Sequence, residues 1–108
     1  MIGFNQWDEE WELGGYISST GNKTPYVDRI RCKNYIHVFP NTAYYFNIDA
    51  LNYAYCYDIE KNFLGIAPYV ASGNGWICTT LPNSTYMTFD LSTSYGVTYK
   101  KDICINLS

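Results

Sequence analysis

Short stretches in which apolar and polar residues alternate, broken every few residues by turn-forming residues, restrict the fold of this chain more than any other feature. In Tyr35-Ile-His-Val-Phe39, every second side chain is β-branched and apolar. A period of two places successive side chains on opposite faces of a strand. Clusters such as Ser72-Gly-Asn-Gly75 and Pro82-Asn-Ser84 end these stretches and are typical of turns. The pattern predicts strands and contains no convincing helix.

Ten segments carry this strand pattern. They are Gly15 to Ser18, Asp28 to Cys32, Tyr35 to Val38, Ala43 to Ile48, Tyr53 to Asp58, Asn62 to Ile66, Trp76 to Thr79, Thr85 to Asp90, Gly96 to Lys100 and Asp102 to Asn106. Many short strands at close spacing are typical of antiparallel sandwiches and barrels. The sequence therefore predicts an all-β, antiparallel fold of eight to ten short strands.

The length and the apolar content of the chain predict one domain. A chain of 108 residues, of which 47% are hydrophobic, has enough apolar surface for a single core. Residues 1–10 show no clean period and read as an entry segment or linker from a longer polypeptide, so residues 11–108 form the expected domain. No apolar stretch approaches the roughly 20 residues that span a bilayer, and no basic leader precedes one. We therefore expect neither membrane insertion nor a secretion signal.

The charges are few and unevenly placed. Asp8, Glu9, Glu10 and Glu12 contribute −4, and the net charge of the whole chain is −3, so the rest of the chain sums to +1. Only seven residues are Lys or Arg, which argues against a nucleic-acid partner because phosphate binding needs a concentration of cations. The polar surface must come from 10 Asn, 9 Thr and 7 Ser. Amides and hydroxyls suit neutral ligands such as sugars.

The cysteines predict neither a metal site nor a redox pair. Cys32, Cys56, Cys78 and Cys104 are more than twenty residues apart, whereas zinc sites bring two ligands within a few residues. Buried free thiols are the favoured interpretation, and two disulfides are the alternative. We expect no metal and no cofactor.

Catalytic groups are scarce. His37, the only histidine, shares a strand face with Tyr35 and Phe39 and is interpreted as structural. A glycosidase would need a pair of carboxylates, but most of the candidates fall at predicted strand ends or turns, where Asp is common for backbone reasons. These candidates are Asp49, Asp58, Glu60 and Asp90. We therefore expect a protein without enzymatic activity.

The chain is rich in aromatic residues, with 3 Trp, 12 Tyr and 5 Phe. Many of these rings can fill the core, because aromatic residues favour strands. Others can be platforms on which a sugar ring stacks its C–H face, while Asn, Asp and Arg groups bind the hydroxyls. The residues expected to form such a site are Trp11, Arg31, Tyr45, Asn52, Tyr53, Tyr55 and Trp76.

Three segments favour exposure of some rings. Tyr53-Ala-Tyr-Cys-Tyr57 places three phenols on one strand face, and three buried hydroxyls would need three partners. Trp76 follows a glycine-rich loop that either presents the ring to solvent or lets it plug one end of the sandwich. Adjacent rings must point to opposite faces, so Tyr45 lies outside if Tyr44 and Phe46 are core residues. Arg29 and Arg31 share one side of their strand, and either is exposed or paired with a carboxylate such as Asp49 or Asp58.

The order of several motifs is familiar. These are Trp11-x-x-Gly14-Gly-Tyr-Ile, Asp28-Arg-Ile-Arg-Cys-Lys-Asn-Tyr-Ile-His-Val38, Pro40-Asn-Thr-Ala-Tyr-Tyr-Phe46, Tyr57-Asp58 with Lys61-Asn-Phe-Leu-Gly65, Thr79-Thr-Leu-Pro-Asn-Ser-Thr-Tyr86 and Asp102-Ile-Cys-Ile-Asn-Leu107. Over residues 11–108 the chain resembles the jelly-roll, carbohydrate-binding-module-like domains carried on tail, baseplate and fibre proteins of phages of Gram-positive bacteria. Cys32 stands where that family usually has Thr, Asn41 replaces its turn Gly, and the closing strand lacks a frequent Glu, so no polar site is carried over to that strand.

The resemblance implies a two-sheet jelly roll that recognises polysaccharide on the host cell envelope as a non-catalytic adhesion module of a virion or prophage tail. Its implied partners are the cell-wall polysaccharide and other tail proteins, with copies brought together through the parent protein. The alternative is a structural domain that joins or decorates virion parts and binds no sugar.

Overall fold

A computed structural model describes residues 10–26, 29–48, 51–92 and 105–107, and every regular element in these ranges is a strand. The strands are β1 (Trp11–Leu13), β2 (Gly15–Tyr16), β3 (Lys23–Thr24), β4 (Ile30–Cys32), β5 (Ile36–His37), β6 (Ala43–Phe46), β7 (Leu51–Tyr57), β8 (Phe63–Ile66), β9 (Tyr69–Ser72), β10 (Gly75–Thr79), β11 (Tyr86–Leu91) and β12 (Ile105–Leu107). The predicted all-β, antiparallel class is confirmed. The described residues already hold more strands than the eight to ten predicted.

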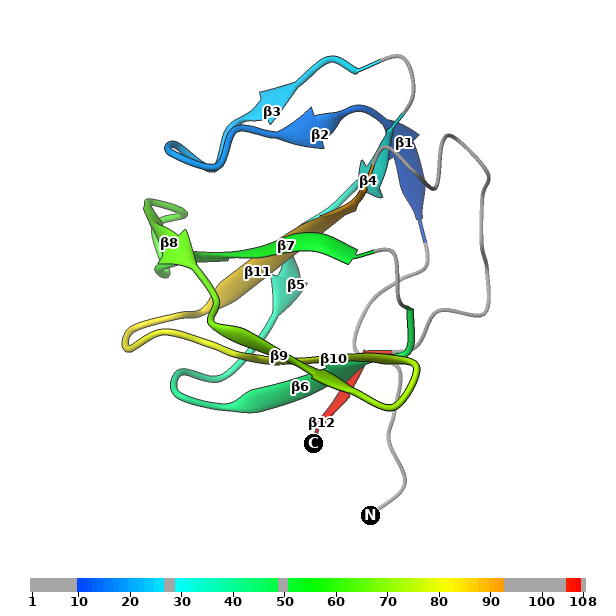
Figure 1. Ribbon diagram of the computed structural model, residues 1–108. Helices are drawn as coiled ribbons and strands as arrows, with labels where there is room; N and C mark the ends of the chain where they lie inside the picture. Colours follow the sequence, from blue (N-terminus) through cyan, green and yellow to red (C-terminus); the bar gives the residue numbers. More distant parts are fainter. Residues whose placement is uncertain (1–9, 27–28, 49–50, 93–104, 108) are drawn as a thin grey trace.

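The strands form two sheets and a hairpin, stacked as in Figure 1. The large sheet has the order β1-β4-β11-β7-β8, with β5 also paired to β11, and the small sheet has the order β12-β6-β10-β9. The hairpin, β2 with β3, lies over the face of the large sheet that points away from the small sheet. All pairs are antiparallel. These strand orders establish a sandwich-like arrangement, and the jelly-roll topology stays a prediction.

The alternation misses three strands. The strands β1, β3 and β9 are two to four residues long, and pairing with β4, β2 and β10 fixes them. In β9 the first three residues are all exposed, so burial gives no alternating pattern. The predicted strand at Gly96 to Lys100 lies outside the described residues, as do residues 1–9 of the predicted entry segment, residues 1–10.

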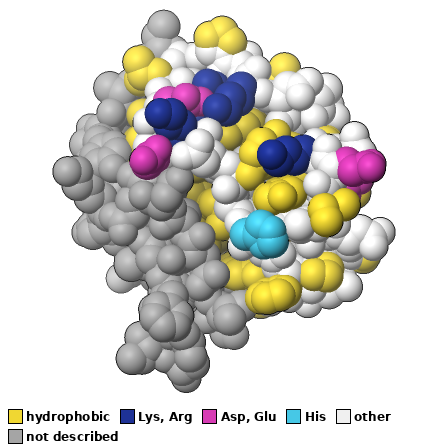
Figure 2. All heavy atoms as spheres, turned by 180° about the vertical axis from the view of Figure 1, so that it is seen from behind, with side chains coloured by type: hydrophobic (Ala, Val, Ile, Leu, Met, Phe, Trp, Pro, Cys, Tyr) yellow, Lys and Arg dark blue, Asp and Glu magenta, His cyan; other side chains and the backbone are white. Residues whose placement is uncertain are grey.

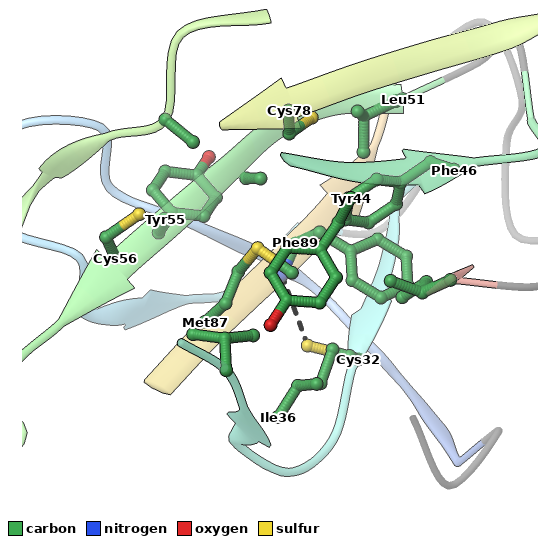
Figure 3. Packing of buried hydrophobic residues seen from close by; sticks show 14 of the residues in the cluster. Cys32, Ile36, Tyr44, Phe46, Leu51, Tyr55, Cys56, Cys78, Met87 and Phe89 are labelled. Carbon is green, nitrogen blue, oxygen red and sulfur yellow. Dashed lines mark hydrogen bonds between the residues drawn. The ribbon is translucent and has the colours of Figure 1, made fainter. Parts of the chain in front are cut away.

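The main core lies between the two sheets (Figure 3). Phe89 of the large sheet contacts Phe46 of the small sheet edge to face, with ring centroids 5.2 Å apart, and the ring of Trp11 also contacts Phe89, with centroids 5.5 Å apart. Tyr44 and Phe46 are buried and Tyr45 is half-buried on the outer face, as the adjacent-ring argument predicts. The strand alternation therefore predicts correctly which of the side chains of β6 are buried in the core.

The described cysteines are free and buried, which confirms the interpretation for Cys32, Cys56 and Cys78. Cys104 lies outside the described residues. The Sγ of Cys32 accepts a hydrogen bond from the Phe89 backbone N–H at 3.2 Å, drawn as a dashed line in Figure 3. Burial raises the pKa of Cys32 to about 12 and that of Cys78 to about 12, so these thiols stay protonated and inert.

A second buried layer lies between the large sheet and the hairpin. Tyr16 of the hairpin packs on Tyr55 with ring centroids 5.1 Å apart, and its hydroxyl donates to the Cys32 carbonyl at 3.0 Å. The Tyr57 hydroxyl donates to the Gly21 carbonyl at 2.6 Å. The large sheet is therefore covered on both faces. The buried layer between this sheet and the hairpin contains tyrosines whose hydroxyls form hydrogen bonds.

Candidate functional site

A cleft of about 320 Å³ opens between the hairpin and the beginning of β7. Its lining combines aromatic rings with groups that form hydrogen bonds. The lining residues are Tyr16, Ile17, Ser18, Thr24, Tyr26, Arg29, Asn52, Tyr53 and Tyr55. A cleft of this size and composition is typical of small-ligand sites.

The aromatic side of the cleft is a row of tyrosines. Tyr53 contacts Tyr55 with ring centroids 6.2 Å apart, and Tyr55 continues the row to Tyr16. Across the cleft, the guanidinium of Arg29 lies over the ring of Tyr26, 4.2 Å from its centroid. Tyr26 is 41% exposed and Tyr53 is half-buried, so these two rings present surface to a ligand while Tyr16 and Tyr55 form the base.

A fully buried carboxylate, Asp90, holds the base of the cleft together. It accepts hydrogen bonds from the Tyr16 backbone N–H at 3.0 Å, the Tyr55 hydroxyl at 3.1 Å and the Asn52 amide at 3.2 Å. Burial raises the pKa of Asp90, although these hydrogen bonds oppose the shift. One carboxylate of β11 thus fixes the hairpin, through Tyr16, relative to β7, through Asn52 and Tyr55.

Arg29 supplies unused donors at this cleft. Its Nη1 lies 3.8 Å from the nearer Asp90 oxygen, which is an ion pair but too long for a hydrogen bond. Its Nε is buried and has no hydrogen-bond partner among the described residues. A buried donor without a partner is costly. The Arg29 side chain is 16% exposed, and this exposed part can meet the acceptor oxygens of a ligand.

The guanidinium of Arg31, by contrast, forms its hydrogen bonds within the protein. Its Nε and Nη2 each lie 2.7 Å from a Glu12 carboxylate oxygen, and its Nη1 donates to the carbonyls of Gly15 and Thr24 at 3.0 Å. These donors anchor the hairpin to the sheet, and Arg31 is not among the residues that line the cleft, so its role in ligand binding stays a prediction. Both arginines are paired with carboxylates, as one of the two predicted alternatives has it, but the partners are Glu12 for Arg31 and Asp90 for Arg29 rather than Asp58.

The Glu12 anchor predicts an acid-dependent stability. Burial alone would raise the pKa of Glu12, but hydrogen bonds and charge from Lys23 and Arg31 outweigh it and lower the pKa. The stabilisation is therefore present above the unfolded pKa, near 4.5, and is lost as pH falls through the folded pKa. Glu12→Gln should lower the free energy of unfolding by about 1 kcal/mol at pH 7.

The measurement is urea unfolding of wild type and Glu12→Gln between pH 7 and pH 2. The difference between the two proteins should shrink toward zero on the acid side. A difference that stays constant over this range would contradict the role of the carboxylate charge. The half-exposed Lys23, 2.6 Å from the same carboxylate, contributes less, so Lys23→Met provides a milder comparison.

The structure brings three of the predicted site residues into the cleft, Asn52, Tyr53 and Tyr55. Tyr55 is fully buried, so its predicted exposure is wrong, and it is part of the base rather than an open platform. Trp76 is half-buried and lies outside the cleft. Its ring contacts Tyr69, and the ring of Tyr69 in turn contacts Tyr53 in the lining of the cleft. Neither Trp11 nor Tyr45 is among the lining residues, since Trp11 packs on the core and Tyr45 lies on the outer face of the small sheet.

Sequence reasoning missed Tyr26 and Asp90 as site residues. Tyr26 follows Pro25 in an irregular segment without any period, so no pattern singles it out. The strand pattern places Asp90 at the end of a strand, yet it lies inside β11 between the buried Phe89 and Leu91. A carboxylate in a strand whose other residues are uncharged is the available signal, since an unpaired buried charge is expensive.

The other carboxylates do not join Asp90 at the cleft. Asp58 lies in the turn after β7, where its Oδ1 accepts the backbone N–H groups of Glu60 and Asn62 at 2.9 Å. Asp49 lies outside the described residues. The described residues thus bring no acid–base pair together at the cleft. His37 is exposed beside the ring of Tyr86, 5.1 Å away, and appears in cyan on the face shown in Figure 2.

Neither a metal cluster nor a membrane-spanning helix occurs in the part of the chain that the structure describes. Comparisons with protein-family models, with curated proteins and with solved structures give no match to this chain.

Proposed function

We propose that this protein is a non-catalytic carbohydrate-binding module and that the cleft under the hairpin is its binding site. The observation that carries the proposal is the pairing of a tyrosine-lined wall with unused hydrogen-bond donors in one cleft. The exposed parts of the Tyr26 and Tyr53 rings offer apolar surface to a pyranose. Arg29 and Asn52 lie beside them with polar groups for the hydroxyls. Aromatic surface with a few placed polar groups is what a sugar site requires.

The base of the cleft is built to keep its shape. Asp90 fixes Tyr55, Asn52 and the hairpin by hydrogen bonds that run inside the protein. Burial raises the pKa values of the Tyr16 and Tyr55 phenols, so both stay neutral donors. A pre-organised cleft avoids the entropic cost of ordering side chains on binding, which supports a binding role for these groups.

The biological setting is proposed from the resemblance of the sequence motifs. We place the protein on the virion of a phage or on a prophage tail, as an adhesion module for host cell-envelope polysaccharide, with other tail proteins as its structural partners. A single shallow cleft binds weakly, and display in several copies on a parent protein converts later contacts into intramolecular ones. Nucleic acid and membrane insertion have no part in this proposal.

A structural assembly domain is the second candidate function, and one surface favours it. A groove beside the turn after β7 includes the apolar side chains of Pro40, Ile59 and Leu64. Ile59 is 72% exposed, and Phe39 close by along the chain is 66% exposed. Exposed apolar side chains gathered around a groove are typical of protein contacts. In this alternative, the groove meets another virion protein and no sugar is bound.

The decisive substitution for sugar binding is Tyr53→Ala. Removing a ring that lines the cleft should weaken binding about tenfold, because stacking and buried area at one ring are worth roughly 1–1.5 kcal/mol. The measurement is binding to a panel of Gram-positive cell-wall polysaccharides by isothermal calorimetry, with the thermal midpoint as a check on folding.

Tyr45→Ala is the matched control, since it truncates a half-buried tyrosine on the outer face of the small sheet and should leave affinity unchanged. Equal loss in both variants would contradict the assignment of the cleft. If the wild-type domain binds nothing on the panel, even when displayed in many copies on beads, the assembly function takes the place of the proposed one.

A further inference from the structure

The inner face of the small sheet extends beyond the large sheet and forms an open shelf, made of Tyr69, Ala71 and Trp76. Trp76 of β10 pairs with Phe46 on one side and with Ala71 on the other. Residues paired across strands share a face, and Phe46 is buried between the two sheets, so this is the inner face. Tyr69 is nevertheless 42% exposed and Ala71 is exposed. The large sheet therefore does not cover this part.

The shelf is continuous with the cleft around the edge of β7. Pairing of β8 with β7 begins at Tyr55 opposite Ile66, and the chain then leaves the large sheet toward β9, as Figure 1 shows. The ring of Tyr69 contacts two other rings at this edge: its centroid is 6.0 Å from that of Tyr53 and 5.3 Å from that of Trp76. An unbroken row of rings thus leads from the lip of the cleft onto the shelf.

The shelf belongs to a long uncharged segment. Between Lys61 and Asp90 the chain contains no Asp, Glu, Lys, Arg or His. The strands β9 and β10 lie entirely within this segment, and the exposed Asn74 in their connecting turn offers an uncharged amide. A surface of rings and uncharged groups suits a neutral ligand.

We infer that the shelf is a second subsite, so that the ligand is a linear, neutral oligosaccharide with one end in the cleft and the following units over Tyr69 and Trp76. This inference rests on the proposed function, since it assigns the length and charge of the ligand that the cleft takes. Ala71, which pairs with Trp76, is small and exposed, and Tyr69 beside it is 42% exposed. Tyr53, at the junction, serves both subsites.

The test is the dependence of affinity on chain length. Gluco-, galacto-, manno- and N-acetylglucosamine oligomers of one to six units, together with galacturonic acid oligomers, are titrated against wild type and Tyr69→Ala. In wild type, the neutral oligomers that bind should gain about tenfold in affinity as they become long enough to reach the shelf. Tyr69→Ala should lose this gain and keep wild-type affinity for the shortest ligand.

Val70→Ala is the matched control, because Val70 is 62% exposed on the opposite face of the same strand and should behave like wild type. The inference is overturned if wild type shows no gain with length, if Tyr69→Ala keeps the gain, or if only the acidic oligomers show it. Equal weakening of all lengths in Tyr69→Ala also overturns it, by placing Tyr69 in the cleft itself. Absence of binding at every length instead overturns the proposed function.

Discussion

Asp90→Ala is expected to lower the free energy of unfolding by about 3–5 kcal/mol, because it leaves several buried polar groups without their partner. The Tyr16 N–H and the Tyr55 hydroxyl would lose their acceptor, and the Arg29 guanidinium would lose its counter-ion. Asp90 itself is fully buried, so water does not take over these bonds without rearrangement. Urea unfolding at pH 7, followed by tryptophan fluorescence, measures the loss.

Asp90→Asn separates shape and hydrogen bonding from charge. The amide keeps one acceptor oxygen for the Tyr16 N–H, so this variant should lose clearly less stability than Asp90→Ala. Because burial raises the pKa of Asp90, its contribution to stability declines as pH rises through the folded pKa, and the amide lacks this dependence. Asp90→Ala within about 1 kcal/mol of wild type would show that the network contributes little.

Local alternation predicts a large part of this fold. In the segment around β5, Ile36 and Val38 are buried while Tyr35, His37 and Phe39 are exposed, as the period of two requires. The same reasoning orders Tyr44, Tyr45 and Phe46 correctly. In these strands one face meets the core and the other meets solvent, so the chemical pattern and the burial pattern coincide.

The pattern fails in β7, where both faces are covered. Three tyrosines on one face predict exposure, since buried phenols need partners. Tyr55 and Tyr57 are buried nonetheless, because the hairpin lies over them and the partners come from elsewhere. Asp90 accepts from Tyr55, and Gly21 accepts from Tyr57. The hairpin consists of two short strands, and no local signal in the sequence says which face of which sheet it covers.

The cleft is a product of contacts between distant parts of the chain. The bond from the Tyr16 N–H to Asp90 joins residues 74 positions apart, and that from Asn52 to Asp90 joins residues 38 apart. Sequence reasoning identified Arg29 and Arg31 as a pair on one side of a strand. It did not distinguish the arginine that anchors the hairpin from the one that lines the cleft, because their acceptors lie on other elements. The types of side chain that line the cleft were therefore predictable from the sequence, but their hydrogen-bond and ion-pair partners were not.

Gly75→Ala is expected to destabilise the small sheet by about 3 kcal/mol, at the upper end of the cost of overpacking a core. A methyl group on Gly75 would fall on the backbone carbonyl of Phe46 in the neighbouring strand β6. Backbone atoms in a paired strand cannot turn aside as a side chain does, so β10 must move away from β6. Such a shift carries the adjacent Trp76 with it. Stability is measured by urea unfolding, and the indole environment by near-ultraviolet circular dichroism.

Gly73→Ala, in the turn that precedes β10, is the matched control. Gly73 has φ +58, and the nearest atom to an added methyl group, the Tyr45 hydroxyl oxygen, is 3.9 Å away. This substitution therefore costs only the backbone strain of a left-handed residue, about 1–2 kcal/mol. A larger loss in Gly73→Ala than in Gly75→Ala would contradict the close packing of β10 on β6. Because both glycines lie beside the shelf, a Gly75→Ala protein that still folds should also lose the gain in affinity with oligosaccharide length, while Gly73→Ala should retain it.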